Sequence, residues 1–276
     1  MNIGIIGLGL IGGSIAKAIT EKTEHKVLGF DKEKSIVCRA KLLGAISGEF
    51  SLQNPEQCDI IILALYPKTS IEVFKTIAPL LKRNTIVIDC GGIKEIVCNE
   101  IKPIADEYDI TFIGGHPMAG IEKIGFDHST SELFKNASMI LTPYADTDIK
   151  TLAYVKELFL SIGFGYATII SPKEHDEIIA YTSQLAHILS NAYIKSPTAE
   201  RHKGLSAGSF KDMTRVAYLN ENMWGELFME NKDNLVSEID TLISNLSEYK
   251  NAIVSGDKER LVSLLRDGRI KKENIK

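Results

Sequence analysis

Short apolar runs alternate with longer mixed stretches through the first 170 residues. The runs are nearly continuous, as in strands that are buried on both faces of a parallel sheet, and the stretches between them have helical character. Strands are therefore expected at about 2–6, 26–30, 59–65, 84–89, 111–113, 138–142 and 166–170, with helices near 15–19, 67–81, 93–105 and 148–162. This alternation predicts an α/β fold with a mostly parallel sheet, whose ligands bind beyond the carboxyl ends of the strands.

The pattern becomes helical after residue 170. Ser171 can cap a helix, Pro172 suits its first position, and Glu174 stands where the acid of a capping box belongs. A long helix is expected from there to about Lys195. One side of this helix is polar, which indicates either a solvent-facing stripe or the wall of a site; its residues are Ser183, Gln184, His187 and Asn191.

A further helix is expected at about 233–255, where apolar residues recur at near-heptad spacing. That spacing indicates packing of helix on helix, within one chain or between two. The charged tail at 266–276 is expected to fray. We therefore expect two domains, an α/β domain at 1–170 and an all-α domain at 171–276.

A glycine-rich turn follows the first strand. Residues 7–12 carry the pattern GxGxxG directly between a strand and a helix. In dinucleotide-binding folds these glycines provide a tight turn, close approach of the backbone to the pyrophosphate, and close packing of helix on strand. Asp31 ends the second strand, where a carboxylate can bind a ribose 2′-hydroxyl and would repel a 2′-phosphate. We expect NAD rather than NADP, although Lys32 or Lys34 could hold that phosphate.

A histidine follows two glycines after the strand at 111–113. The segment is Gly114-Gly115-His116-Pro117. Glycines permit tight or left-handed turns, and Pro117 fixes the chain and favours an extended His116. We expect a loop at the carboxyl edge of the sheet, where a histidine is well placed to exchange a proton with a ligand. The alternative is a histidine that caps a neighbouring group.

The composition excludes several classes of protein. A net charge of −4 and a pI near 5.9 argue against a general binder of nucleic acid or of anionic membranes. No apolar run approaches the ~20 residues that span a bilayer, and the N-terminus lacks the basic region of a signal peptide. The four cysteines show no CxxC spacing. We expect a cytoplasmic, reduced protein without a metal site, in which Cys90 is a small buried hydrophobe.

Several segments together resemble the prephenate dehydrogenases, the TyrA family of tyrosine biosynthesis, over residues 3–234. They are Gly7–Gly12 with Asp31, Asp89–Lys94, Gly114–Lys123, Leu133-Phe134 with Met139–Pro143, Glu174–Asp176, Ser183–His187, Ser209–Ala217, Met223-Trp224 and Glu230-Asn231. As a set these segments are far more specific than GxGxxG alone. The resemblance implies an N-terminal Rossmann domain followed by a helical domain that forms a homodimer.

The resemblance also implies a reaction and its residues. The family oxidises prephenate with NAD+ and releases CO2, which gives 4-hydroxyphenylpyruvate. His116 would take the proton of the ring hydroxyl, Arg215 would bind a substrate carboxylate, and His187 would contact the substrate. Further substrate-binding positions are Lys211, which shares a helix face with Arg215, and Gly92, Gln184 and Trp224. Cofactor-binding positions are Gly7, Leu8, Gly9, Leu10, Ile11, Gly12, Asp31, Leu65, Tyr66, Pro67 and Cys90.

Three positions depart from the family pattern. Gly92 stands where many members have a serine that orients the histidine and the substrate, Gln184 where many have histidine, and Ile121 where many have threonine. The choice between prephenate and arogenate, which differ in a keto or amino group, therefore stays open. A β-hydroxyacid or imine reductase and a non-catalytic NAD-binding protein are more distant alternatives, which His116 and Arg215 disfavour.

Overall fold

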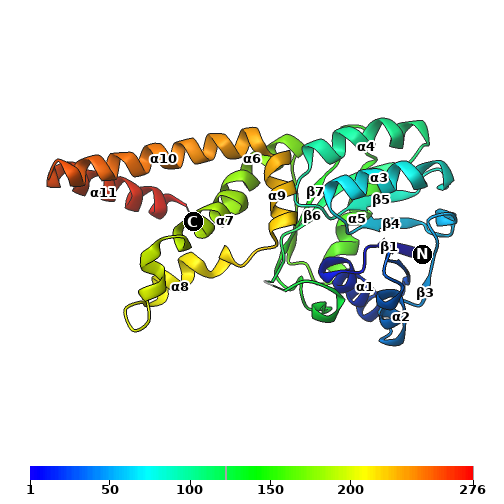
Figure 1. Cartoon of the computed structure of the whole chain (residues 1–276). Helices are drawn as coiled ribbons and strands as arrows, with labels where there is room; N and C mark the ends of the chain where they lie inside the picture. The colour runs from blue at the N-terminus through cyan, green and yellow to red at the C-terminus, as the bar shows by residue number, and fades with distance from the viewer. Residues whose placement is uncertain (122, 276) are drawn as a thin grey trace.

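The computed structural model describes residues 1–121 and 123–275, and its N-terminal part is an eight-stranded sheet (Figure 1). The spatial order of the strands is β3-β2-β1-β4-β5-β6-β7-β8. The strands are β1 (Asn2–Ile6), β2 (Lys26–Phe30), β3 (Gly48–Glu49), β4 (Ile60–Leu63), β5 (Ile86–Asp89), β6 (Thr111–Pro117), β7 (Ser138–Thr142) and β8 (Tyr166–Ile169). Every pair is parallel except β6 with β7. The predicted α/β fold with a mostly parallel sheet is confirmed.

Helices cover both faces of this sheet, because its central strands are apolar on both sides. One apolar layer packs under α1 (Leu10–Lys22), α2 (Lys34–Leu42) and α5 (Ile149–Ser161). The other packs under α3 (Pro67–Ile77) and α4 (Glu95–Glu107). The chain winds outward from β1 to β3 and then returns to β4. This reversal between β1 and β4 places a binding crevice at their carboxyl ends.

Strand β6 differs from the expected loop around His116. It pairs in parallel with β5 as far as Ile88 opposite Ile113, and then in antiparallel with β7 from Gly114 to Pro117. His116 therefore lies within a strand. Its two preceding glycines have no positive φ. They are needed for close approach, because a Cβ at Gly114 would lie 2.2 Å from Thr142 Oγ1, and one at Gly115 would lie 2.4 Å from the Asp89 carbonyl oxygen.

A long helix leads from the sheet into the second half of the chain, as predicted. It comprises α6 (Pro172–Ile179), a π-helical turn η4 (Ala180–Leu185) and α7 (Ala186–Ile194). The hydroxyl of Ser171 accepts a hydrogen bond from the Glu174 amide, so the expected cap is present. The sequence pattern did not predict the π-helical turn.

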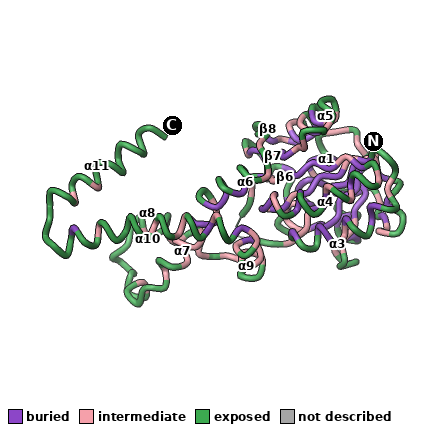
Figure 2. Tube along the Cα trace, turned by 90° about the horizontal axis from the view of Figure 1, so that it is seen from above, coloured by how far each residue is buried: buried purple, intermediate pink, exposed green. Residues whose placement is uncertain are grey.

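The remaining helices form an arm that extends away from the sheet, except for the helix at residues 221–230, which stands at the edge of the sheet domain (Figure 1). These helices are α8 (Gly208–Thr214), α9 (Glu221–Glu230), α10 (Lys232–Val254) and α11 (Lys258–Asn274). The chain also has short helical turns, which are η1 (Pro55–Gln57), η2 (Ala78–Leu80), η3 (Phe126–His128), η5 (Pro197–Arg201) and η6 (Arg215–Ala217). The tail that was expected to fray is α11 as far as Asn274, capped by Asp257 and packed back on α10. Buried residues concentrate in the sheet, and α10 and α11 are mostly exposed (Figure 2). Across the described ranges, no helix is both long and apolar enough to cross a membrane.

Candidate active site at the carboxyl edge of the sheet

The glycine-rich turn has the shape of a phosphate cradle. Gly7 has a φ of +90°, and a Cβ there would lie 2.5 Å from the Ala64 carbonyl oxygen. A Cβ at Gly12 would lie 1.9 Å from the Gly7 carbonyl oxygen, so both positions require glycine. A Cβ at Gly9 would meet no atom of the described residues within 4 Å. Gly9 thus faces open space at the amino end of α1, where Leu10 and Ile11 present backbone N–H groups to an anion.

Asp31 lies next to this cradle at the end of β2. One carboxylate oxygen accepts a hydrogen bond from the Leu8 amide at 2.8 Å, and the other accepts one from the Glu33 amide at 2.9 Å. The carboxylate is thereby fixed beside the turn, with lone pairs left for a ribose hydroxyl. Together with the open space at Gly9, this arrangement fits NAD, which the cradle, Asp31 and the neighbouring loops would hold.

The loops after β4 and β5 complete the same rim. Leu65, Tyr66 and Pro67 follow β4, and Pro67 is the first residue of α3. A Cβ at Gly7 would lie 2.8 Å from Leu65 Cδ2, so this loop touches the cradle. Cys90 follows β5, and burial together with the Asp89 carboxylate raises the pKa of its thiol. Cys90 therefore behaves as a neutral apolar side chain.

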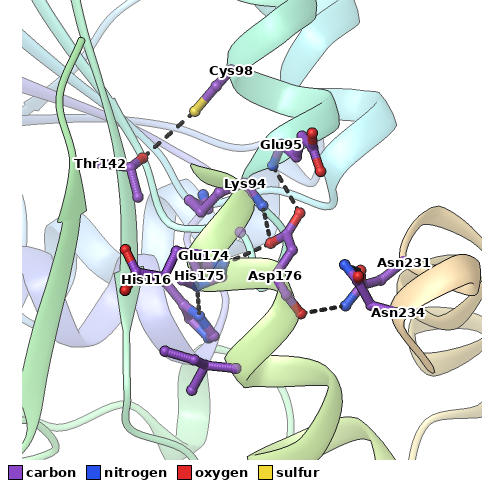
Figure 3. Close-up of polar contacts among 12 residues, drawn as sticks. Lys94, Glu95, Cys98, His116, Thr142, Glu174, His175, Asp176, Asn231 and Asn234 are labelled. Carbon is purple, nitrogen blue, oxygen red and sulfur yellow. Dashed lines mark hydrogen bonds and ion pairs between the residues drawn. The ribbon is translucent and has the colours of Figure 1, made fainter. Parts of the chain in front are cut away.

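His116 is held by two residues of α6 (Figure 3). Its Nδ1 lies 2.9 Å from Nε2 of His175, and Nδ1 of His175 lies 2.6 Å from Oδ1 of Asp176. Asp176 also accepts hydrogen bonds from the Lys94 and Glu95 amides, each at 2.8 Å. Its carboxylate therefore caps the amino end of α4 while it binds His175.

These contacts determine which nitrogen of His116 is free to act. A carboxylate only accepts hydrogen bonds, so His175 donates from Nδ1 and its Nε2 is left as an acceptor. His116 then donates from Nδ1, and its own Nε2 carries a lone pair. A Cβ at Gly92 would lie 3.8 Å from that Nε2, so the lone pair faces the loop after β5. The arrangement is that of a general base fixed in one tautomer.

The surroundings keep the ring of His116 neutral. Burial lowers its pKa well below the usual 6.5, and the neighbouring His175 and the Lys94 ammonium lower it further. Burial likewise lowers the pKa of His175, against the opposing effect of Asp176. Both rings are therefore neutral at neutral pH, as proton acceptance requires.

A second group of predicted residues lies on α7, η6 and α9. The ring of His187 stacks on the indole of Trp224, with 3.8 Å between centroids and 30° between planes. Arg215 begins η6, which packs on α7, and its charge helps to lower the pKa of His187 after the larger effect of burial. Lys211 is exposed on α8. The structure therefore associates His187 with Trp224 and places Arg215 near them.

Gln184 and Gly92, both predicted to bind the substrate, differ in how much open space surrounds them. Gln184 lies in the π-helical turn, is 1% exposed, and bonds to the Leu227 carbonyl and to Asn231. Its amide thus holds α9 instead of lining an open site. Gly92 leaves room, because a Cβ there would lie 3.6 Å from Leu227, an ordinary contact distance. Glu122, within the segment that carries His116, lies outside the described residues.

The sequence patterns gave no role to Asp89, Lys94, His175 or Asp176. Their types and positions were visible, but the contacts between them join residues that lie far apart in the chain, as Lys94 and Asp176 do. The fully buried Lys94 pairs with Asp89, and a buried lysine is rarely anticipated from sequence. Within the parts of the chain that the structure describes, no three His, Cys, Asp or Glu residues gather as metal ligands.

Comparison with known proteins matches both halves of the chain. The sequence model of the prephenate dehydrogenase nucleotide-binding domain matches residues 15–167. The model of the prephenate dehydrogenase dimerization domain matches residues 171–267. The cyclohexadienyl dehydrogenase of Zymomonas mobilis is 31% identical over 270 residues, which are 95% of this chain and 91% of that protein.

Solved structures extend the similarity to the whole fold. The prephenate dehydrogenase from A. aeolicus in complex with hydroxyphenyl propionate and NAD+ has a TM-score of 0.86 and 30% identity, covering 100% of this chain and 98% of that one. The arogenate dehydrogenase of Synechocystis has a TM-score of 0.84 and 25% identity, covering 99% of each chain.

Proposed function

Because this chain belongs to the prephenate dehydrogenase family, we propose that it oxidises prephenate with NAD+ and releases CO2 to give 4-hydroxyphenylpyruvate. The observation that carries this proposal is His116, held through Nδ1 by His175 with Nε2 left as an acceptor. This base lies on the strand that reaches the carboxyl edge of the sheet, the edge that also carries the dinucleotide cradle.

His116 Nε2 accepts the proton of the ring hydroxyl as that C–OH group becomes a carbonyl. Bound NAD+ supplies the chemistry of hydride acceptance from the same carbon. The electron pair of the bond to the leaving carboxylate passes through the ring to the carbonyl oxygen as CO2 departs. The ring becomes aromatic, and the oxygen takes back a proton to form the phenol hydroxyl of the product. Asp176 and His175 keep His116 in the tautomer whose Nε2 can accept the proton, because each N–H of this hydrogen-bond relay faces an acceptor. Aromatisation makes the step effectively irreversible.

Arg215 and His187 are the residues that we assign to the substrate. A guanidinium can form two parallel hydrogen bonds to a carboxylate, which suits prephenate, and Arg215 lies near His187. The stacked rings of His187 and Trp224 offer a flat surface to a six-membered ring. We assign to Lys211, which is exposed on α8, the role of a second positive charge that attracts the substrate carboxylates.

Arogenate is the second candidate substrate. The chain is 25% identical to the arogenate dehydrogenase of Synechocystis over nearly its full length. The two substrates share the ring on which His116 acts and differ only in the side chain. The same base and the same cofactor would therefore serve both reactions.

One assay separates these proposals. Purified protein is mixed with NAD+ and then with prephenate, with arogenate or with neither, and NADH absorbance and CO2 release are followed together. We expect NADH and CO2 to form in equal amounts with prephenate, and a higher kcat/KM for prephenate than for arogenate. A higher kcat/KM for arogenate would reassign the substrate. Absence of NADH with both would reject dehydrogenase activity.

A further inference from the structure

His116 is held at two points, its ring and the backbone before it. The ring is bound by His175, and the preceding residue, Gly115, is bound through both of its backbone groups. Both sets of contacts lead to Lys94, the residue directly before α4. Lys94 is 0% exposed, although lysine is almost never fully buried unless it is paired.

The side chain of Lys94 holds the backbone. Its ammonium group donates to the Asp89 carboxylate and to the Gly115 carbonyl oxygen, the latter at 2.6 Å. The other oxygen of Asp89 accepts a hydrogen bond from the Gly115 amide at 3.0 Å. Ladder pairing between β5 and β6 ends at Ile88 and Ile113. The ion pair therefore continues the connection between these strands where their own hydrogen bonds stop, one residue before His116.

The backbone of Lys94 holds the ring. Its amide donates to Asp176 Oδ1, the same oxygen that lies 2.6 Å from His175 Nδ1. His175 in turn binds His116 (Figure 3). A shift of Lys94 would therefore move Asp176 and His175 together with Gly115, so the ring and the backbone of His116 would change position at once.

Burial of this ion pair has a cost that needs an explanation. Taking two charges out of water is expensive, and replacing a buried pair with apolar residues is often neutral or stabilising. A purely structural role could be filled by apolar side chains. Apolar side chains cannot hydrogen-bond the two backbone groups of Gly115, and the Lys94 ammonium also presents a positive charge to the imidazole.

We propose that Lys94 and Asp89 form a positioning pair that sets His116 for proton transfer in the reaction. This inference rests on the proposed function, because it assumes that His116 is the base. Among the described residues, Lys94 next to α4 and His175 of α6 act directly on His116. Asp89 of β5 pairs with Lys94, Asp176 of α6 bonds to His175, and Glu230 of α9 is coupled to Asp176. Of these, Lys94 supplies the fixed positive charge.

The test compares three variants of the full-length protein. Lys94→Met removes the ammonium and leaves the buried Asp89 carboxylate. The double variant Asp89→Asn/Lys94→Met removes both charges and is expected to fold even where the single variant does not. Lys102→Met is the matched control, since Lys102 lies on α4, the helix that Lys94 precedes, and pairs with Asp106 and Asp146 at the surface.

Each variant is assayed for NAD+ affinity, for kcat and KM across pH, and for the NMR titration of the His116 ring, assigned with His116→Asn. In the double variant we expect NAD+ affinity within about threefold of wild type, because the cradle is untouched. We expect kcat to fall at least about tenfold, a part of the 10²–10⁴-fold that a general base contributes. The fall of kcat/KM at low pH (the acid limb of the profile) and the midpoint of the His116 ring titration should both move to higher pH. Where Lys94→Met folds, both shifts should be larger than in the double variant. Lys102→Met should match wild type.

A folded double variant with wild-type kcat and an unmoved His116 titration would overturn the inference. The ring titration does not depend on turnover. If wild-type protein oxidised neither prephenate nor arogenate, the proposed function would fail, and a shifted titration in the double variant would still support the link between Lys94 and His116.

Discussion

His116 combines a strand position with a neutral ring. Burial, His175 and Lys94 all lower its pKa, so the ring remains a proton acceptor in weakly acidic solution. The unfolded chain binds a proton to this residue near pH 6.5. Below that pH the unfolded state holds more protons than the folded state, and the free energy of unfolding falls as the pH drops. The neutral ring that the proposed mechanism needs therefore costs stability under acidic conditions.

We expect His116→Asn to retain NAD+ binding while kcat falls roughly 10²–10⁴-fold, because asparagine cannot accept the proton. In wild-type protein, kcat/KM should fall only below the ordinary histidine pKa of ~6.5, since burial and Lys94 keep the ring neutral. Steady-state kinetics across pH, with calorimetry for NAD+, measure both effects.

His128→Asn is the control for this experiment, since His128 is exposed in η3. It should leave kcat and the acid limb unchanged. Near wild-type turnover by His116→Asn with the same acid limb would reject the mechanism, and His187 would then be tested next.

Gly92 offers a gain of function. Its Cβ position lies in ordinary contact with Leu227 and 3.8 Å from His116 Nε2, so a serine fits there. We expect Gly92→Ser to fold normally and to raise kcat by up to about tenfold, the value of roughly one hydrogen bond. Gly92→Ala adds the carbon without the hydroxyl and should leave kcat near wild type.

An equal rise in kcat for both Gly92 variants would show that the hydroxyl is not responsible. Gly115→Ser gives the opposite case, because its Cβ would lie 2.4 Å from the Asp89 carbonyl oxygen. That variant should lose the cooperative thermal transition seen by circular dichroism.

At the scale of elements, the sequence predicted what depends on local pattern. The apolar runs of β1, β4 and β5 identified the buried parallel strands, and Ser171 to Glu174 identified the start of α6. The turn expected at Gly114 and Gly115 was wrong, because two glycines are equally compatible with close packing in a strand. Helix α11 was missed, since its charged sequence lacks a clear apolar face.

The residues of the candidate site likewise fall into those that local sequence patterns predicted and those that only tertiary contacts reveal. His116 and the dinucleotide cradle could be predicted, because local glycine and proline patterns mark them. The roles of Lys94 and Asp176 could not, because they arise from contacts between β5, α4 and α6 that tertiary packing alone creates. Gln184 stood in a polar stripe, yet the π-helical turn rotates it against α9.

The cradle and the end of β2 give a prediction for cofactor choice. Asp31→Ala should weaken NAD+ binding roughly 10–100-fold, the value of hydrogen bonds to a charged acceptor, and should reduce the discrimination against NADP+. Kinetics with both cofactors measure the change. Lys32→Ala is the comparison, and it should leave the preference for NAD+ intact. Wild-type protein that used NADP+ as efficiently as NAD+ would contradict this assignment.

The whole molecule combines a compact sheet domain with a thin helical arm (Figures 1 and 2). We propose domains at 1–170 and 171–276, with the arm joining two copies of the chain. Apolar side chains remain uncovered along α10, where Ile243, Leu246 and Ile253 are each more than half exposed. A single chain would leave this surface in water. These residues fall within 171–267, the range that the model of the prephenate dehydrogenase dimerization domain matches.

Light scattering should therefore find a homodimer at micromolar concentration. The double variant Ile243→Glu/Leu246→Glu should weaken dimerisation at least about 100-fold, because it places charges in an apolar contact. Asn245→Glu, an exposed polar position on the same helix, should remain dimeric. A monomeric wild-type protein would contradict the proposal that the helical arm forms a dimer interface.

The stack of Trp224 on His187 gives the protein an optical reporter of its own. The chain contains a single tryptophan, and its indole lies 3.8 Å from an imidazole whose pKa burial and Arg215 lower. A protonated imidazole quenches indole emission, so fluorescence should brighten as the pH rises through that pKa, below ~6.5. His187→Asn should abolish this change. Emission from unlabelled protein would then follow, in real time, any ligand that separates the two rings.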